Sequence, residues 1–263
     1  IKCPIYQLNG LIMRNVTDQV LCNFLLLTRL TVSSHISRIS HLTNLRILDL
    51  SRYTDNGYQS LIHNRELLTL TNLTNLKLNI HIRKISYLTK LRTLTLSGYY
   101  NRDELSVSNE ELIALTNLTS LDISSSYDIT NLSPLTKLQK LIIFDYSCNA
   151  IDDTCCRANI LLPLTNLTYL NICNIPAVKI SHLTNLTYLN MSENAIDNNS
   201  LFHLTNLSTL LMNDCYTIDN INHLHKLREL HIKDSNIHYA GFSLLTNLTS
   251  IHVRHKRDLL TKK

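Results

Sequence analysis

The stretch that decides the fold is residues 183–191, which read LTNLTYLNM. Its apolar residues follow the spacing L-x-x-L-x-x-L-x-L, and this spacing returns in eleven copies along the 263-residue chain. Leucine fills 52 positions, whereas glycine and proline have four each, which is too few turn-forming residues for a chain of hairpins. Self-similarity at a period of about 20–30 residues is typical of repeat proteins.

Each copy closes on a short x-L-x-L-x segment, in which apolar residues alternate with polar ones. This period of two predicts a strand with its apolar side chains on one face. The third and fourth apolar positions of the copies are Leu30/Val32, Leu48/Leu50, Leu76/Leu78, Leu94/Leu96, Leu121/Ile123, Leu141/Ile143, Leu170/Ile172, Leu189/Met191, Leu210/Met212, Leu230/Ile232 and Ile251/Val253.

Such a strand cannot bury its apolar face alone, so the copies must stack side by side into a parallel sheet with one shared core. All 44 ladder positions are apolar when Phe24 and Leu27 are counted as the first two. At about 1.5–3 kcal/mol for each buried side chain, the gross driving force is ample for a solenoid.

This pattern resembles the leucine-rich-repeat superfamily over about residues 24–253. The resemblance implies an α/β solenoid shaped as a curved horseshoe, with about eleven short parallel strands on its concave face. 3₁₀ turns and a few helices are expected on its convex face. The short units, such as residues 128–136 (DITNLSPLT), look like those of bacterial internalins and phosphatase regulatory subunits. The superfamily works chiefly through recognition, so the resemblance implies a binding protein.

The copy spacing predicts where helices form. Successive copies are 18, 28, 18, 27, 20, 29, 19, 21, 20 and 21 residues apart. The short copies have too little chain for a full helix, and we expect 3₁₀ turns or extended backbone there. The long copies should carry helices within Tyr58 to Leu68, after Ser108, and within Ile151 to Leu162. Ser108 and Glu111 have the spacing of a capping box.

The turn after each strand departs from the superfamily pattern. Three residues after the fourth ladder position, these repeats usually carry Asn or Cys, whose side chain satisfies buried backbone groups. Only Asn194 and Cys215 follow that pattern here, and the three long copies carry Tyr53, Tyr99 and Tyr146. The regular asparagine ladder is therefore mostly missing, and the sequence does not indicate what replaces it.

Three regions are expected: an N-terminal cap (1–23), the solenoid (24–253) and a basic C-terminal tail (254–263). The net charge is +5, and the tail contributes +4 of it through five basic residues and one acid, which leaves +1 for residues 1–253. We therefore expect no nucleic acid on the folded body. No apolar stretch approaches the ~20 residues that a membrane helix needs, so no membrane interaction is expected.

Seven cysteines, an odd number without a pairing rhythm, favour free thiols in a reducing compartment. The expected location is cytoplasmic, with a secreted or surface location left open. Six glycosylation sequons arise inside the Leu-Thr-Asn-Leu phrase, where glycans would crowd copies only about 5 Å apart. We interpret those sequons as by-products of the repeat; they begin at Asn72, Asn117, Asn166, Asn185, Asn206 and Asn247.

Catalytic machinery is not evident, and the sequence predicts no enzyme, no cofactor and no metal. Four histidines recur one residue before the first ladder leucine, at His41, His182, His203 and His223, and this recurrence indicates a structural position. His231 and His252 take the middle outward position of neighbouring strands. Two histidines alone are a poor zinc site, so we interpret them as surface residues.

The candidate partner-binding residues point away from the core on the expected strands. Most outward positions in copies one to five are small or polar, whereas copies six to nine offer larger side chains. Tyr169 and Tyr188 should share one column of the sheet, and Ile142 and Leu211 another. This composition is typical of protein-binding hot spots. The predicted set is Lys140, Ile142, Phe144, Tyr169, Tyr188 and Leu211, together with a rim of Tyr53, Tyr99 and Tyr146.

The function predicted from these features is a non-enzymatic scaffold that binds a protein partner, of unknown identity, through its concave face. Three alternatives stay open. A substrate-recognition subunit of a ubiquitin ligase needs an adaptor-binding motif ahead of the repeats. A structural component of a virus particle or ribonucleoprotein should remain in the particle at high salt. A secreted receptor or adhesin should carry occupied sequons. The oligomeric state is not predicted.

Overall fold

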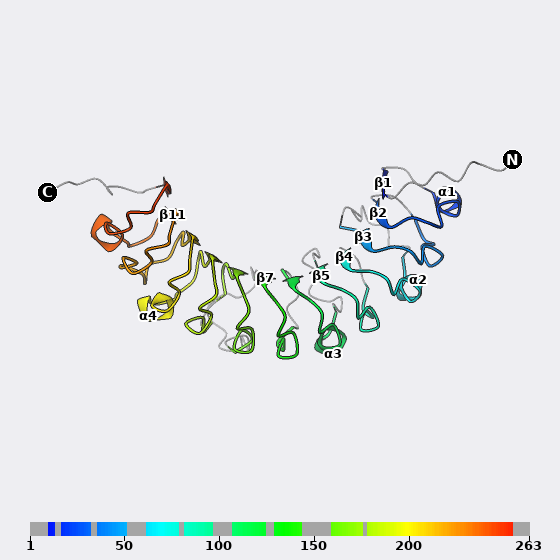
Figure 1. Ribbon diagram of the computed structural model, residues 1–263, viewed down its shortest axis with the longest axis horizontal. Coiled ribbons are helices and arrows are strands. Elements are labelled where there is room, and N and C mark those ends of the chain that lie inside the picture. The colour runs from blue at the N-terminus through cyan, green and yellow to red at the C-terminus, as the bar shows by residue number, and fades with distance from the viewer. Residues whose placement is uncertain are drawn as a thin grey trace. The chain divides into compact units, whose positions relative to one another are not determined.

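The computed structural model describes residues 10–13, 17–32, 36–51, 62–78, 82–96, 107–124, 129–143, 159–175 and 178–254. The chain forms two compact units, Ile1–Lys137 and Leu138–Lys263. Within each unit, every repeat adds one strand parallel to the strand before it (Figure 1). This is the leucine-rich-repeat solenoid that the sequence predicts.

The first unit contains six parallel strands in sequence order. Leucines of equal register lie opposite one another, and Leu30, Leu48, Leu76, Leu94 and Leu121 are all fully buried. β1 lies within the segment predicted as the N-terminal cap and pairs with β2. The strands are β1 (Gly10–Met13), β2 (Arg29–Val32), β3 (Ile47–Asp49), β4 (Asn75–Leu78), β5 (Thr93–Leu96) and β6 (Ser120–Asp122).

The second unit also contains six parallel strands. Its third-position leucines are fully buried from Leu141 to Leu230, whereas Ile251 in the last strand is 45% exposed. The eleven predicted strands are confirmed as β2–β12. Those of this unit are β7 (Lys140–Ile142), β8 (Tyr169–Asn171), β9 (Tyr188–Asn190), β10 (Thr209–Leu211), β11 (Glu229–Lys233) and β12 (Ser250–Arg254).

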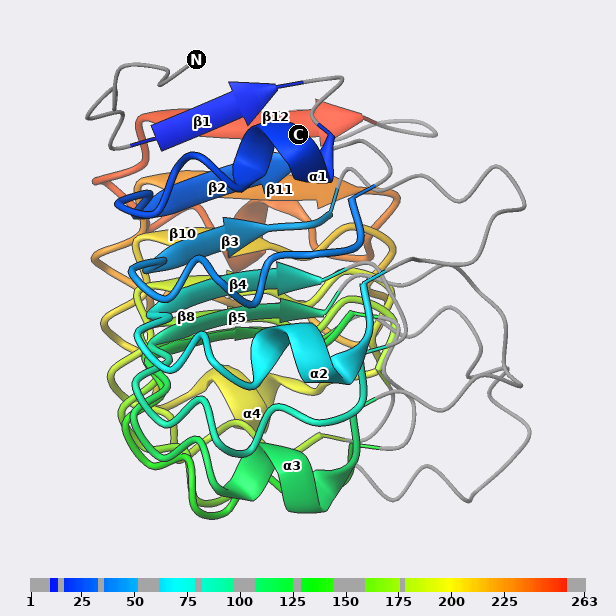
Figure 2. The same ribbon diagram turned by 90° about the vertical axis from the view of Figure 1, so that its right-hand side faces the viewer.

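Short helices lie across the leucine core from the strands (Figure 2). α2 (Asn64–Leu67) and α3 (Asn109–Ile113) lie in the first two long inserts, as predicted. In the third insert, residues 159–163 form a turn and residues 151–158 lie outside the described part. The remaining helical segments are α1 (Asp18–Leu21), α4 (Asn198–Leu201) and the 3₁₀ turn η1 (Tyr239–Gly241).

The prediction that short copies carry only 3₁₀ or extended backbone is wrong at α4. One α-helical turn fits there because Asp197 caps it, accepting a hydrogen bond from the Ser200 backbone N–H at 3.0 Å. A capping carboxylate supplies a partner that the first turn otherwise lacks.

The predicted capping box is also wrong, although α3 begins after Ser108 as expected. The Ser108 side chain makes no capping hydrogen bond. The Glu111 carboxylate instead accepts the backbone N–H groups of Ile85 and Ser86, at 2.7 and 2.8 Å. Glu111 bonds to the preceding repeat and does not take part in local capping, because the N–H groups of Ile85 and Ser86 have no strand partner.

The Leu-Thr-Asn-Leu phrase is explained by a ladder of side-chain amides. Asn44, Asn72, Asn117, Asn185, Asn206 and Asn247 each donate an Nδ2–H to a backbone carbonyl of the preceding copy, at 2.7–3.0 Å. Where a lysine replaces this Asn, its ammonium donates to the amide oxygen of the preceding Asn, as Lys90 does to Asn72 at 2.7 Å. The sequons that begin at Asn72, Asn117, Asn185, Asn206 and Asn247 therefore have their amides in this ladder.

Three of the four recurring histidines make hydrogen bonds between repeats, as a structural position predicts. The Nε2–H groups of His41, His182 and His223 donate to the carbonyls of Leu21, Leu161 and Leu201, at 3.1–3.2 Å. The acceptor lies in the preceding repeat each time. The fourth, His203, packs edge-on against Phe202.

The turns that follow β8 to β11 show what replaces the asparagine ladder there. One residue per turn adopts a left-handed backbone, at Asn174, Glu193, Asp214 and Asp234. The N–H groups of the first three donate to carbonyls of the next repeat, at 2.7–3.0 Å. Backbone bonds thus continue the pairing past the strands, and side chains such as Ser192, Asn213 and the two described below add further bonds to backbone groups.

Those two positions follow the superfamily pattern. Asn194 is 4% exposed; its amide oxygen accepts the Ile175 N–H at 2.8 Å, and its Nδ2–H donates to the Ile172 carbonyl. The Cys215 thiol donates to the Met191 carbonyl at 3.1 Å. Burial raises the pKa of Cys215 to about 11, so it remains a neutral thiol at ordinary pH.

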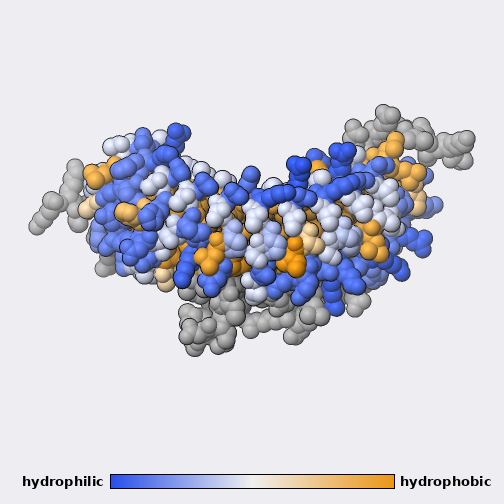
Figure 3. All heavy atoms as spheres, turned by 60° about the horizontal axis from the view of Figure 1, so that its bottom comes forward, coloured by the Kyte–Doolittle hydropathy of each residue, from blue (hydrophilic) through white to orange (hydrophobic). Residues whose placement is uncertain are grey.

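The surface formed by turns and helices is mixed in polarity. Apolar patches lie among hydrophilic side chains there (Figure 3), and exposed apolar residues on these segments include Leu68, Leu162 and Phe202. Among the described helices, none has the length and hydropathy needed to cross a bilayer.

Candidate functional site

The candidate site lies on the outward face of the second unit, meaning the strand side chains that alternate with the buried leucines. The register between strands groups these side chains into columns. One column runs Lys140, Tyr169, Tyr188, Thr209, Glu229 and Ser250. The next runs Ile142, Asn171, Asn190, Leu211, His231 and His252.

Tyr169 and Tyr188 form a closely packed aromatic pair in the first column. Their rings are stacked, with centroids 4.0 Å apart and planes 3° from parallel. The Lys140 ammonium lies 4.4 Å from the centroid of the Tyr169 ring. β7 and β9 flank β8, so one face of Tyr169 meets a cation and the other meets Tyr188. We name Lys140, Tyr169 and Tyr188 the tyrosine stack.

The surroundings of Tyr188 favour its neutral phenol. Burial, the hydrogen bond with Tyr169 and the nearby Glu229 carboxylate all raise the pKa of Tyr188. The hydroxyl therefore stays protonated and able to donate. The stack offers a binding partner a rigid aromatic edge, hydroxyl groups and one positive charge.

Ile142 and Leu211 share the second column, as the sequence predicts, but they are not neighbours. Asn171 and Asn190 stand between them. Asn190 is used locally, since its side-chain oxygen accepts the N–H and the hydroxyl of Ser192, at 3.1 and 2.8 Å. Ile142 and Leu211 are half-buried and lie at the two sides of this polar pair.

Four predicted site residues, Phe144, Tyr53, Tyr99 and Tyr146, lie outside the described residues. Of the predicted set, the structure brings Lys140, Tyr169 and Tyr188 into contact and places Ile142 and Leu211 beside them.

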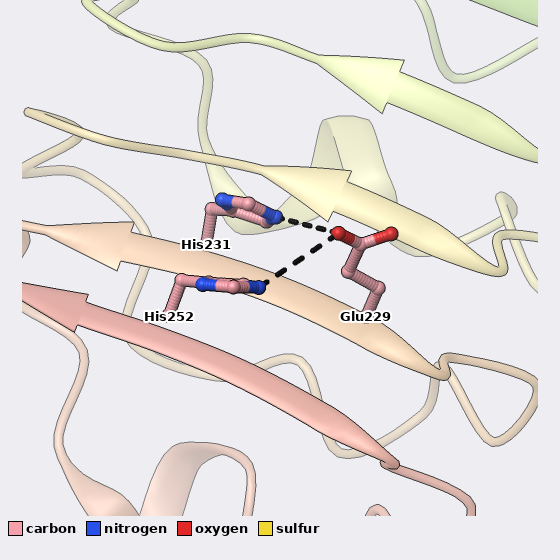
Figure 4. A group of neighbouring side chains, drawn as sticks. All are labelled: Glu229, His231 and His252. Carbon is pink, nitrogen blue, oxygen red and sulfur yellow. Dashed lines mark hydrogen bonds and ion pairs between the residues drawn. The ribbon is translucent and has the colours of Figure 1, made fainter.

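A second cluster joins His231 and His252 to Glu229, a residue that the sequence pattern does not single out. The Glu229 carboxylate oxygen Oε1 lies 2.8 Å from His231 Nε2 and 4.0 Å from His252 Nε2 (Figure 4). The two imidazole rings are stacked, with centroids 4.1 Å apart. The signal was available: Glu229 and His231 are two residues apart on one strand, so they share its outward face.

Hydrogen bonding holds the Glu229 carboxylate in its charged form. The bond with His231 lowers the pKa of Glu229, and the nearby His252 acts in the same direction. The other carboxylate oxygen lies 3.4 Å from the Thr209 hydroxyl. We name Glu229, His231 and His252 the histidine cluster.

No protein-family model matches the sequence, and no curated protein matches it. Solved structures do. An internalin (InlF) from Listeria monocytogenes is 24% identical, with a TM-score of 0.64, over 91% of this chain and 71% of that one. A leucine-rich-repeat protein from Leptospira interrogans is 16% identical, with a TM-score of 0.53, over 95% of this chain and 82% of that one.

The structure of TLR13 in complex with the single-stranded RNA ssRNA13 is also similar. It is 22% identical, with a TM-score of 0.52, over 94% of this chain and 41% of that one. At these identities the similarity establishes the fold alone.

Proposed function

We propose that the chain is a non-enzymatic interaction module that binds a protein partner on the outward face of β7–β10, as its leucine-rich-repeat fold suits it to do. The single observation that carries this is the tyrosine stack. Interface hot spots are enriched in tyrosine and arginine, and a rigid aromatic anchor loses little side-chain entropy on binding.

The dimensions suit a hot spot. Strands lie about 4.8 Å apart, so the four strands β7–β10 span about 14 Å. Within that width stand the tyrosine stack and, at either side, Ile142 and Leu211. Polar side chains surround these residues: Asn171 and Asn190 lie between Ile142 and Leu211, and Thr209 and Glu229 continue the column of the tyrosines. An aromatic anchor among polar side chains is typical of a binding hot spot.

A single-stranded RNA is bound in the TLR13 structure, so RNA is the natural competitor. The stack argues against it here. RNA-binding aromatics offer an open ring face on which a base can stack, whereas Tyr169 has one face against Tyr188 and a lysine over the other. A base could therefore not stack on Tyr169 without displacing Lys140 or Tyr188.

The test uses the full chain as bait in affinity purification, followed by mass spectrometry. The bait variant Tyr169→Ala/Tyr188→Ala should lose the captured partner. With a purified partner, the double change should weaken binding by about thirtyfold or more, which corresponds to 2 kcal/mol for a hot spot. Thermal stability should fall only slightly, because a surface ring pair contributes about 0.5–1.5 kcal/mol.

The matched control is Thr93→Ala/Ser120→Ala, which changes the same column on two neighbouring strands of the first unit. It should leave binding unchanged. Unchanged affinity for the tyrosine variant, or capture of RNA in place of protein, would reject the proposal.

The tyrosines Tyr53, Tyr99 and Tyr146, which lie outside the described residues, stay a separate prediction from the sequence. Tyr53→Phe distinguishes a structural hydroxyl from a contact residue. Loss of binding with full stability supports the rim, and a large loss of stability assigns Tyr53 to the turn.

A further inference from the structure

We infer that the histidine cluster is a binding site for a divalent transition-metal ion of the zinc class. Glu229, His231 and His252 each offer one donor atom, and the three atoms all lie within 4.8 Å of one another. Among the residues that the structure describes, this is the one place where three such side chains converge. The inference is independent of the proposed protein partner, although both use the outward face.

The geometry of the sheet brings the three side chains of the histidine cluster together. Glu229 and His231 are two residues apart on β11, so both project from its outward face. His252 is the direct partner of His231 on β12. Parallel strands lie about 4.8 Å apart, which brings the second imidazole within reach of the same carboxylate (Figure 4).

The donor set is chemically suited to zinc. Two imidazoles and one carboxylate form a known three-ligand set for Zn²⁺, and the fourth position is then open to water or to a group from a bound molecule. Imidazole also binds Ni²⁺ and Cu²⁺ well, whereas Mg²⁺ and Ca²⁺ prefer oxygen donors. The cluster should therefore select transition metals over Mg²⁺ and Ca²⁺.

Small side-chain movements complete the geometry. A tetrahedral ion with ligand bonds of about 2.0–2.2 Å separates its donors by about 3.4 Å. The contact of 2.8 Å between Glu229 and His231 must open, and that of 4.0 Å between Glu229 and His252 must close. The imidazole rings must also turn out of their stacked arrangement, so that both Nε2 lone pairs point to the ion.

These movements are available because the cluster is accessible. The side chains of Glu229, His231 and His252 are 42%, 25% and 57% exposed. Two hydroxyl groups surround the donors: Thr209 lies 3.4 Å from Glu229 Oε2, and Ser250 lies 3.0 Å from His252 Nε2. The Thr209 contact orients the carboxylate, while the Ser250 hydroxyl must release His252 when the ion binds.

The experiment titrates the 263-residue chain with Zn²⁺ by isothermal calorimetry, with Mg²⁺ and Ca²⁺ as comparison ions. We expect one equivalent of Zn²⁺ to bind and the comparison ions to give no signal. In NMR spectra, the imidazole resonances of His231 and His252 should shift together as Zn²⁺ is added. Co²⁺ as a probe should give the strong visible absorption of a four-coordinate site.

The variants separate this site from incidental zinc binding. His231→Ala and His252→Ala should each abolish the one-equivalent binding, and Thr209→Val should weaken it by about tenfold, as loss of an outer partner does. The matched control is His225→Ala, which removes an exposed histidine on a turn. Zinc affinity that survives both cluster variants, or that falls equally in the control, would overturn the assignment.

Discussion

Replacing Glu66 tests how neighbouring repeats are held together. Its side chain is 8% exposed, and its Oε2 accepts the backbone N–H groups of Ile39 and Ser40, at 3.1 and 3.2 Å. Glu66→Ala leaves both donors without this acceptor. At about 1–3 kcal/mol for each unsatisfied group, and with Ser40 half-buried and open to water, we expect a loss of about 2–4 kcal/mol.

Glu66→Gln removes the negative charge of Glu66 but keeps a side-chain oxygen in its place. The amide oxygen can still accept both N–H groups, but a hydrogen bond to a charged group contributes about 1.5–3 kcal/mol and a neutral one about 1. The expected loss is therefore about 1 kcal/mol at neutral pH. The control is Arg65→Ala: Arg65 lies 3.4 Å from the other carboxylate oxygen but is 76% exposed, so its removal should cost under about 1 kcal/mol.

The direction of the pKa shift of Glu66 predicts how the free energy of unfolding changes with pH. Burial alone would raise the pKa of Glu66, but the N–H donors of Ile39 and Ser40 outweigh it and lower the pKa. A lowered pKa means that the stabilisation is complete above the unfolded-state value, about 4.5, and is lost as pH falls through the folded-state value. The difference between wild type and Glu66→Gln should therefore shrink on acidification.

Urea unfolding followed by circular dichroism at several pH values measures these differences. Hydrogen exchange provides a local readout, because the amides of Ile39 and Ser40 should exchange faster in Glu66→Ala. Equal stability of wild type and Glu66→Ala, or a difference between wild type and Glu66→Gln that does not change with pH, would refute the reasoning.

Three further changes probe the core and the turns by chemical denaturation. Gly241→Ala places a Cβ 2.0 Å from the backbone oxygen of Asp219, so the backbone must move and we expect a loss of at least about 2 kcal/mol. Asn194→Ala leaves buried backbone groups unpaired and should cost about 2–3 kcal/mol; a loss under 0.5 would show that water replaces the amide. Leu189→Ala should cost about 2–5 kcal/mol, whereas Tyr188→Ala, one residue away on the outward face, should cost about 1. A reversed order would mean that the assigned strand face is wrong.

Much of the fold could be predicted because its signal is local and repeated. The period of two places Leu189 inside and Tyr188 outside, and the constant repeat register then puts Tyr169 beside Tyr188. The column of Ile142 and Leu211 was predicted in the same way. The two residues share a column without touching, because β8 and β9 lie between their strands and place Asn171 and Asn190 there.

The helical side was predicted less well because its interactions join different repeats. Ser108 and Glu111 have the spacing of a capping box, yet Glu111 bonds to Ile85 and Ser86 in the preceding repeat. Local spacing cannot reveal this competition. At α4, the capping residue Asp197 allows a helical turn in a copy whose length predicts only 3₁₀ or extended backbone.

The sequence by itself determined which residues form strands, which face of each strand enters the core and which side chains share a column, because one short apolar pattern recurs with a nearly constant register. Tertiary structure alone decided how side chains from different columns and repeats meet. The Glu229 carboxylate turns towards His231 and His252, and Glu66 reaches the backbone of the preceding repeat. These contacts depend on side-chain rotamers and on the distance between stacked strands. The order of the residues does not specify either quantity.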